Sequence, residues 1–238
     1  MKSELLFFML VLTSQLLFSQ ISNDAVIITL RSQESIFLDS LTAVKIDSAL
    51  ESARNNFQID SLPYIHAFRD FVVDELVLRT NAGWANYWNQ GFLRTGEPFI
   101  DSLNEFYNLV AVDTPRFSIS PYLLTYSQPL NIPLLTELFE THPDIIYAEV
   151  NGIIGDGDNI ELVDKDSLLD IAFSIGRFDC PAGCIYRYYW YVSVYLSNGS
   201  YFPNLEEERE RDFSQPILYR WNIPDRYAMT MFQNVDSI

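Results

Sequence analysis

The clearest alternation of apolar and polar positions runs through residues 185–196, where almost every side chain is β-branched or aromatic. Successive side chains of a strand point to opposite faces, so this run predicts a strand with two unlike faces. The face expected to lie on the core consists of Tyr186, Tyr188, Trp190, Val192, Val194 and Leu196. The face that can meet solvent or a partner consists of Ile185, Arg187, Tyr189, Tyr191, Ser193 and Tyr195. Asn198 and Gly199 then favour a tight turn, so residues 200–202 should return antiparallel.

A short cysteine loop precedes this strand. Residues 171–175 alternate between large apolar and small side chains and predict an earlier strand. Between the two strands lie Cys180 and Cys184, the only cysteines of the chain, separated by a segment that contains proline and glycine. In an oxidising compartment we expect a Cys180–Cys184 disulfide, with a metal site or free thiols as the alternatives. Zinc is disfavoured because the chain has only two histidines and no second cysteine pair.

Helical spacing is the main feature of residues 20–95, although residues 25–30 are mostly β-branched and predict a first strand. Asp39 or Ser40 can cap a following helix. Its apolar positions recur at helical spacing at Val44, Ile46, Ala49, Leu50, Ala53 and Phe57. A second helix is predicted from Ser61, with Pro63 in its first turn. Its apolar side is expected to be Ile65, Phe68, Val72 and Leu76.

Two candidate features lie in or just after this second helix. His66 is one position off the apolar stripe, and no neighbouring motif needs a base, so we interpret it as a partly exposed structural histidine. Four aromatic residues follow at Trp84, Tyr87, Trp88 and Phe92. Clustered aromatic residues most often mark buried packing, so this group is expected to close the core between the two halves of the chain. A platform on which a ligand stacks is the alternative interpretation.

The middle of the chain alternates between helical and strand-like segments. Helices are predicted at residues 98–107 and from Asn131 to Pro143, and strands at residues 109–112, 122–126 and 145–150. The order α-β-β-α-β is most of a split βαβ, or ferredoxin-like, pattern. We therefore expect an α+β protein. Its predicted parts are a helical N-terminal segment at residues 20–95, the split βαβ unit at residues 96–151, and a β-rich domain at residues 152–238 that contains the antiparallel hairpin and the short-loop disulfide.

Short motifs in this middle part resemble the prodomain of secreted subtilisin-like proteases. In that family a helix with a Leu-Asn pair leads into a strand, and the domain closes with a helix, a Pro-x-Val step and a Tyr-Ala-Glu-Pro-Asn-like strand. The matching residues here are Leu103, Asn104, Pro143, Asp144, Ile145, Tyr147, Ala148, Glu149, Val150 and Asn151, with Val150 where proline is usual. The resemblance implies a domain that assists folding of its protease and occupies the active-site cleft. No serine protease triad segment follows, so the resemblance implies a separate binding module or only a common α+β shape.

The N-terminal residues predict export. A short basic start precedes an apolar run at residues 5–18, and Ser19 offers a small residue for cleavage, with Gln20 as a second choice. We interpret residues 1–19 as a signal peptide and expect a secreted or periplasmic protein. No later run is long enough to span a bilayer, so no membrane association is expected after cleavage.

Charge narrows the range of partners. The formal net charge is −17, which repels phosphate backbones and anionic lipids, so nucleic-acid binding is disfavoured. No glycine-rich phosphate loop is present and no cofactor is expected. Protein or carbohydrate partners remain, and the oligomeric state is open.

Acidic residues follow the middle unit. Asp156, Asp158 and Asn159, with Asp164 or Asp166, offer oxygen ligands that calcium prefers. Ile160 stands where an EF-hand loop needs its third ligand, so a polar turn between strands is the favoured interpretation and a calcium site the alternative.

These observations favour an exported, non-enzymatic binding module over an enzyme. Its candidate binding surface consists of Arg187, Tyr189, Tyr191 and Tyr195. Such side chains offer a large contact area and lose little conformational entropy on binding. The alternative is that another layer covers this row. A narrower form of the binding-module hypothesis is a subtilisin-type protease inhibitor, in which the segment after residues 147–151 would lie across the active-site cleft of a protease. The alternative functional class is a hydrolase that uses two carboxylates for catalysis. Its candidate carboxylates are Asp156, Asp158, Glu161 and Asp179.

Overall fold

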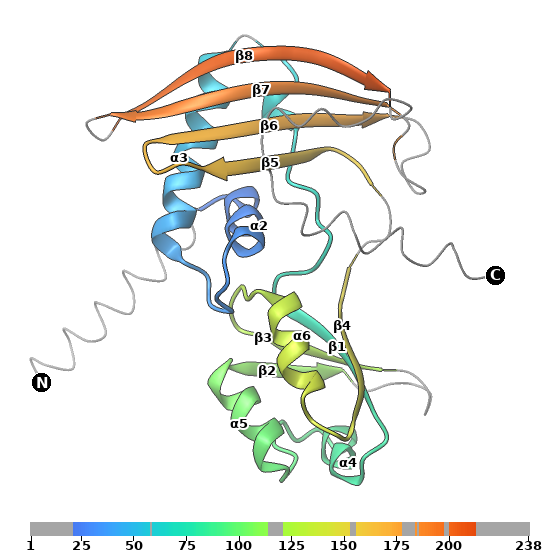
Figure 1. Cartoon of the computed structure of the whole chain (residues 1–238). Coiled ribbons are helices and arrows are strands. Elements are labelled where there is room, and N and C mark those ends of the chain that lie inside the picture. Colours follow the sequence, from blue (N-terminus) through green and yellow to red (C-terminus); the bar gives the residue numbers. More distant parts are fainter. Residues whose placement is uncertain are drawn as a thin grey trace, which may run out of the picture.

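The computed structural model describes residues 21–57, 59–113, 121–152, 156–177, 184, 186–197 and 200–212, with backbone alone at 186 and 206–212. The predicted signal peptide, Asp179, Cys180 and the Asn198–Gly199 turn lie outside these residues. The described part is an α+β structure with two four-stranded antiparallel sheets (Figure 1). The α+β fold class is thus confirmed. Among the described residues, no helix has the length and apolarity needed to cross a membrane.

The first sheet has the strand order β2-β3-β1-β4, and every neighbouring pair is antiparallel. Its strands are β1 (Glu75–Thr80), β2 (Leu109–Asp113), β3 (Tyr122–Tyr126) and β4 (Ile145–Val150). Helix α5 (Pro98–Phe106) precedes β2, and helix α6 (Ile132–Glu140) precedes β4. The connectivity β-α-β-β-α-β with this strand order is that of a split βαβ unit. The predicted α-β-β-α-β order is present, and β1 completes it from the N-terminal side.

The second sheet is a meander in which each strand pairs with the next, β5-β6-β7-β8. Its strands are β5 (Asn159–Asp164), β6 (Leu168–Arg177), β7 (Tyr186–Ser197) and β8 (Ser200–Asp212). The predicted β6, β7 and returning strand are confirmed, with Phe173 opposite Trp190. Charge alone would favour a solvated helix or loop for the run at residues 206–212, but β8 continues through it. Pairing with the long β7 extends the strand where local sequence gave no strand signal.

Helices α2 (Asn23–Ser32) and α3 (Ser40–Asn56) pack against the second sheet, so the two ends of the described chain form one unit (Figure 1). The predicted strand at residues 25–30 is wrong, since these residues lie in α2. Every residue of α2 from Asp24 to Leu30 is buried. A helix that is buried on all sides lacks an apolar stripe and cannot be told from a buried strand by periodicity.

The second predicted helix is also wrong. Only the 3-10 turn η1 (Leu62–Tyr64) forms, and the chain then runs extended from the second sheet to β1 (Figure 1). Ile65 and Ala67 are buried while His66 between them is exposed, which is the two-residue period of extended chain. Leu76, assigned to the helix from sequence, is a buried residue of β1.

Each sheet has its own apolar core. The first core lies between α5, α6 and the first sheet, with Trp88, Leu124 and Phe139 among its buried residues. The second lies between α2, α3 and the second sheet, with Leu50, Phe173 and Val192 among its buried residues. Ile21 and Val73 pack against both cores and link them. Two short helices, η2 (Gly83–Ala85) and α4 (Asn86–Asn89), carry Trp84, Tyr87 and Trp88 of the aromatic cluster, and Phe92 follows α4. Trp88 is the buried member.

Candidate functional site

The outward face of β7 carries the predicted tyrosine row. Helices α2 and α3 pack with the opposite face, which holds Trp190 and Val192. Tyr189 and Tyr191 are half-buried, and their rings stack with centroids 5.7 Å apart and planes 14° from parallel. Tyr195 is 47% exposed and pairs across the strands with Phe202 of β8, which is 54% exposed. We call Tyr189, Tyr191, Tyr195 and Phe202 the aromatic stripe.

Arg187, predicted as part of this surface, is instead an internal anchor. It is 8% exposed, and its guanidinium donates to Oγ of Ser174 at 2.8 Å and forms an ion pair with Asp156. Burial lowers the pKa of Arg187, and the nearby Tyr189 opposes that shift. The structure therefore pairs a candidate contact residue, Arg187, with a candidate metal ligand, Asp156, and this pair fixes the segment before β5 against the sheet.

The residues considered as alternative calcium ligands have separate partners. Asp156 accepts from the N–H of Cys184 at 3.0 Å and pairs with Arg187, while Asp158 accepts from the N–H of Gly176 at 3.2 Å. Asn159 accepts from the N–H of Phe68 at 3.0 Å. Within the described ranges, no group of three or more His, Cys, Asp or Glu side chains is placed to hold a metal ion.

The same contacts bear on the hydrolase interpretation. Asp156 and Asp158 are engaged by different donors, Glu161 stands on β5 opposite Ala172, and Asp179 lies outside the described residues. Catalysis by two carboxylates needs both groups to face one cleft. The described contacts of Asp156 and Asp158 are structural ones that fix loop and strand ends.

The cysteine loop is described only at Cys184, which is buried. Its Sγ lies so close to Gly176 of β6 that a Cβ at that position would collide with it. Cys180 lies outside the described residues, so the disulfide stays a prediction.

A buried carboxylate, which the sequence interpretation missed, lies on the outward face beside the stripe. Asp170 of β6 is 4% exposed, forms an ion pair with Nζ of Lys165 at 2.6 Å, and accepts from Oγ of Ser193 at 2.9 Å. These contacts link β6 to β7 and to the turn before β6. The outward face of the second sheet therefore combines exposed aromatic rings with a polar base fixed by internal bonds.

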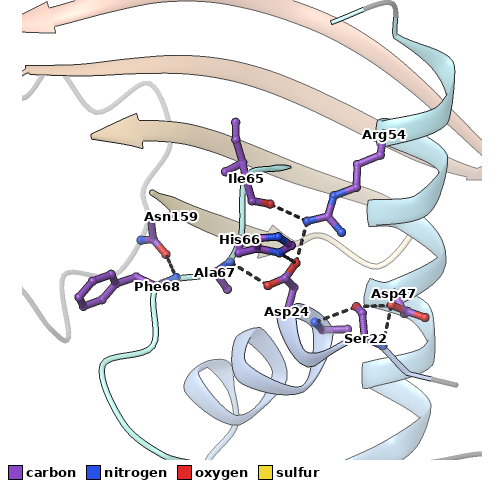
Figure 2. A network of polar contacts seen from close by, with 10 residues as sticks. Ser22, Asp24, Asp47, Arg54, Ile65, His66, Ala67, Phe68 and Asn159 are labelled. Carbon is purple, nitrogen blue, oxygen red and sulfur yellow. Dashed lines mark hydrogen bonds and ion pairs between the residues drawn. The ribbon is translucent and has the colours of Figure 1, made fainter. Parts of the chain in front are cut away.

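Figure 2 shows a second polar network, centred on Asp24 of α2. Oδ2 of Asp24 lies 2.7 Å from Nη2 of Arg54 and 3.0 Å from Nδ1 of His66. Oδ1 of Asp24 accepts from the N–H of Ala67 at 2.9 Å. Nη2 of Arg54 also donates to the carbonyl of Ile65 at 2.7 Å. One carboxylate thus joins α2, α3 and the extended segment that leads to β1.

The electrostatics of this network favour a charged Asp24. Burial by itself would raise the pKa of Asp24, but hydrogen bonds from Arg54, His66 and the Ala67 N–H outweigh it, so the pKa is lowered. The His66 side chain is 68% exposed, whereas that of Asp24 is 7% exposed. A histidine oriented by a carboxylate can act as a base when a nucleophile is in reach. No described serine, threonine or cysteine is hydrogen-bonded to His66, so the network is interpreted as a structural cross-link.

A neighbouring network fixes the same segment on its other side. Arg31 of α2 forms an ion pair with Asp70 at 2.6 Å and also donates to the carbonyl of Phe68 and to Oδ1 of Asn159. These partners come from two separate parts of the chain, the segment around Phe68 and the start of β5. Sequence inspection found neither network, because the only local signal is a charge at each end of the apolar run in α2.

Comparisons with known proteins give no family for this chain. No family model, no curated protein and no solved structure matches it.

Proposed function

We propose that the chain is an exported, non-enzymatic binding protein that contacts a protein partner through the aromatic stripe. The observation that carries this proposal is the exposure of Tyr195 and Phe202 as a cross-strand pair beside the stacked Tyr189 and Tyr191. Large aromatic side chains gathered on one face of a sheet and partly exposed are typical of protein contact surfaces.

Physical arguments support the stripe as a contact surface. Tyrosine and phenylalanine bring large area with two rotatable side-chain bonds, so little entropy is lost on binding. The strand that carries three of these rings pairs with β6 on one side and β8 on the other, so its backbone is already fixed. With a net charge of −17, the chain favours a neutral or basic partner.

Export and the disulfide belong to the same proposal. Residues 1–19 have the features of a signal peptide, and an oxidising exterior would let Cys180 and Cys184 pair. Mass spectrometry of the exported protein, alkylated with and without prior reduction, tests both. The expected result is loss of residues 1–19 and alkylation of the cysteines only after reduction. Alkylation of both cysteines without reduction would contradict the proposed disulfide.

Site-specific photo-crosslinking tests the stripe. A photoreactive phenylalanine is placed at position 195, at position 202, or at the control position Tyr64, which is 77% exposed on η1. The proposal expects the same discrete adduct from 195 and 202 in the producing cells, absent from 64 and lost in a Tyr189→Ala, Tyr191→Ala background. Equal adducts at all three positions, or none at 195 and 202, contradict it.

A subtilisin-type protease inhibitor is the second candidate. It is favoured by the β-α-β-β-α-β connectivity, in which the helix with Leu103 and Asn104 leads into β2 and Tyr147 to Val150 lie in the closing strand β4. The carbonyl of Asn151 accepts from the N–H of Val72, and the Asn151 amide also contacts Glu75, so this residue is already bound within the chain. An inhibitor of this kind would therefore contact the protease through the first sheet more than through the segment that follows β4. Titration of subtilisin with the purified protein decides: no slow-dissociating inhibition at micromolar concentration removes this candidate.

A further inference from the structure

A rigid loop at the end of the first unit displays aromatic rings to solvent. Trp88 of α4 is buried and anchors the loop, with its ring 5.1 Å from that of Tyr122 and its Nε1 donating to the carbonyl of Leu93 at 3.1 Å. The N–H groups of Gly91 and Phe92 donate back to the carbonyls of Trp88 and Tyr87 at 2.9 and 3.0 Å. Gly91 has a φ of 84°, which this tight turn requires.

The anchored loop presents three apolar side chains that the core does not use. Tyr87 is 49% exposed, Phe92 is 56% exposed and Leu93 is 41% exposed. The rings of Tyr87 and Phe92 lie 6.3 Å apart at an angle of 60°. Because the hydrogen bonds of the turn already fix the backbone that carries both rings, a ligand would bind them with little further loss of backbone entropy.

Polar groups beside these rings are amides and not charges. Residues 81–93 contain no Asp, Glu, Lys, Arg or His, in a chain whose formal net charge is −17. Asn86 and Gln90 are exposed on the same turn. Among the described residues, Nδ2 of Asn86 and Oε1 of Gln90 have no hydrogen-bond partner, so a donor and an acceptor remain available next to the rings.

From this arrangement we infer that Tyr87, Phe92, Asn86 and Gln90 form a platform for a neutral oligosaccharide or polysaccharide. The apolar C–H face of a sugar ring packs on aromatic rings, and its hydroxyl groups take hydrogen bonds from amides. Residues 81–93 carry no charged side chain, and the Arg94 that follows them pairs with Glu105 at 3.6 Å, so the platform suits a ligand without charge. The net charge of the whole protein disfavours uronate or sulfate sugars. Rings exposed to solvent fit a polymer whose sugar units extend past them.

This site lies on α4 and the turn after it, not on the second sheet, and it differs from the aromatic stripe in its residues and ligand class, so it goes beyond the proposed function. It also develops the ligand-stacking interpretation of the aromatic cluster, for which Trp84 and Trp88 are unsuited as direct contacts. Trp88 is buried, and Nε1 of Trp84 donates to Asp144 at 3.1 Å. The two exposed members of the cluster, Tyr87 and Phe92, carry the platform.

Native affinity electrophoresis of the mature protein tests the platform. The gels contain hydroxyethyl cellulose, mixed-linkage β-glucan or xylan as neutral polymers, and alginate as the acidic polymer. We expect retardation by at least one neutral polymer and none by alginate. The double variant Tyr87→Ala, Phe92→Ala should weaken the apparent affinity about tenfold or more, since both rings are lost. Both substitutions are at exposed positions, and circular dichroism checks that the fold is kept.

The matched control removes the stripe instead. The double variant Tyr195→Ala, Phe202→Ala should be retarded like the unchanged protein, and it separates this inference from the proposed protein contact. No retardation by any neutral polymer, equal retardation by alginate, or equal loss in the control variant would each overturn the glycan platform. None of these outcomes would alter the crosslinking result expected for the stripe.

Discussion

The two sheets of this protein are stabilised in different ways. The first is built from one continuous stretch, from β1 to β4, and those of its described polar residues that are buried are uncharged: Thr80, Thr95, Asn104, Asn131 and Thr136. The second joins α2 and α3 to strands that lie more than a hundred residues later in the sequence. Among the described residues, every buried charged side chain belongs to this second unit: Asp24, Asp170 and Arg187.

This difference suggests how a discontinuous unit finds its correct arrangement. In the first unit, short connections and alternating apolar residues are enough to bring the strands and helices together. In the second, apolar packing alone would accept several placements of two helices on a sheet. Buried ion pairs add little net stability, but they penalise any placement that leaves a charge unpaired. We infer that Asp24 and Arg31 specify how α2 is placed beside α3, β5 and the extended segment.

The largest expected effect comes from one phenylalanine in each core. Phe139 and Phe173 are both fully buried, one in each apolar cluster. Phe139→Ala and Phe173→Ala should each lower the free energy of unfolding by roughly 3–5 kcal/mol, measured by urea denaturation. Native-state hydrogen exchange should separate them: Phe173→Ala should expose amides of α2 and α3, and Phe139→Ala those of α6. Loss of protection throughout both units in either variant would mean that the two cores unfold as one.

Asp24→Asn should give the next largest effect. The substitution keeps the shape but leaves Arg54 without its carboxylate in a site where Asp24 is 7% exposed. Removing one partner of a buried ion pair is expected to lower the free energy of unfolding by roughly 3 kcal/mol. His66→Ala is the matched control, because its side chain is 68% exposed and should cost less than about 1 kcal/mol. Equal losses in the two variants would show that Asp24 does not organise the network.

Asn104→Leu should act in the opposite direction in the first unit. The amide of Asn104 on α5 is 6% exposed, and both its nitrogen and its oxygen are buried without a hydrogen-bond partner. Replacing an unpaired buried amide by an apolar side chain of similar size should raise the free energy of unfolding by about 1–2 kcal/mol in urea denaturation. A loss of stability instead would mean that the amide binds an internal water, and that the first unit also depends on a buried polar contact.

Sequence patterns predicted best those elements that are half-buried. Strand β7 has one face on the core and one outside, so its two-residue period was visible and its partner β6 followed. Helix α2 is buried on all sides and was taken for a strand. Strand β1 was missed because Leu76 also fitted a helical spacing, although the buried positions Leu76, Leu78 and Thr80 alternate.

The candidate site was harder to predict than the fold, because its residues contact partners that are far away in the sequence. Tyr195 was selected correctly as an exposed aromatic residue of β7, but its partner Phe202 was not. Arg187 looked like a surface residue because its partner Asp156 lies 31 positions away. Such pairings depend on how the strands and loops meet, which local periodicity does not contain.

Acid should affect the two units in opposite directions. Burial and repulsion by Glu75 raise the pKa of Asp74, next to β1, whereas the Asp24 network lowers the pKa of Asp24. The folded state thus binds a proton more tightly at Asp74, and less tightly at Asp24, than the unfolded state does. As the pH falls from neutral through the raised pKa of Asp74, the first unit gains stability. The contribution of Asp24 is complete above its ordinary value of 3.8 and is lost as the pH falls through its lower folded pKa.

Hydrogen exchange between about pH 3 and pH 7, corrected for intrinsic rates, measures both trends. Amides of β1 should become better protected as the pH falls towards 4, while those of α2 should lose protection only at the acidic end. Asp74→Asn should remove the first trend and Asp24→Asn the second. If α2 loses protection at the same pH in the Asp24→Asn variant, another carboxylate controls the acid sensitivity of the second unit.

The smallest expected effect tests whether every ion pair between α3 and the sheet specifies the second unit, or only the buried ones. Nζ of Lys45 on α3 lies 2.6 Å from Oδ1 of Asp164 on β5, with the two side chains 23% and 36% exposed. Solvent screens such a pair, so Lys45→Met should lower the free energy of unfolding by less than about 1 kcal/mol in urea denaturation. The difference should become smaller in about 1 M salt, because salt screens exposed charges. A loss as large as that of Asp24→Asn would show that exposed charges also place the helices, and that burial is not what distinguishes the two units.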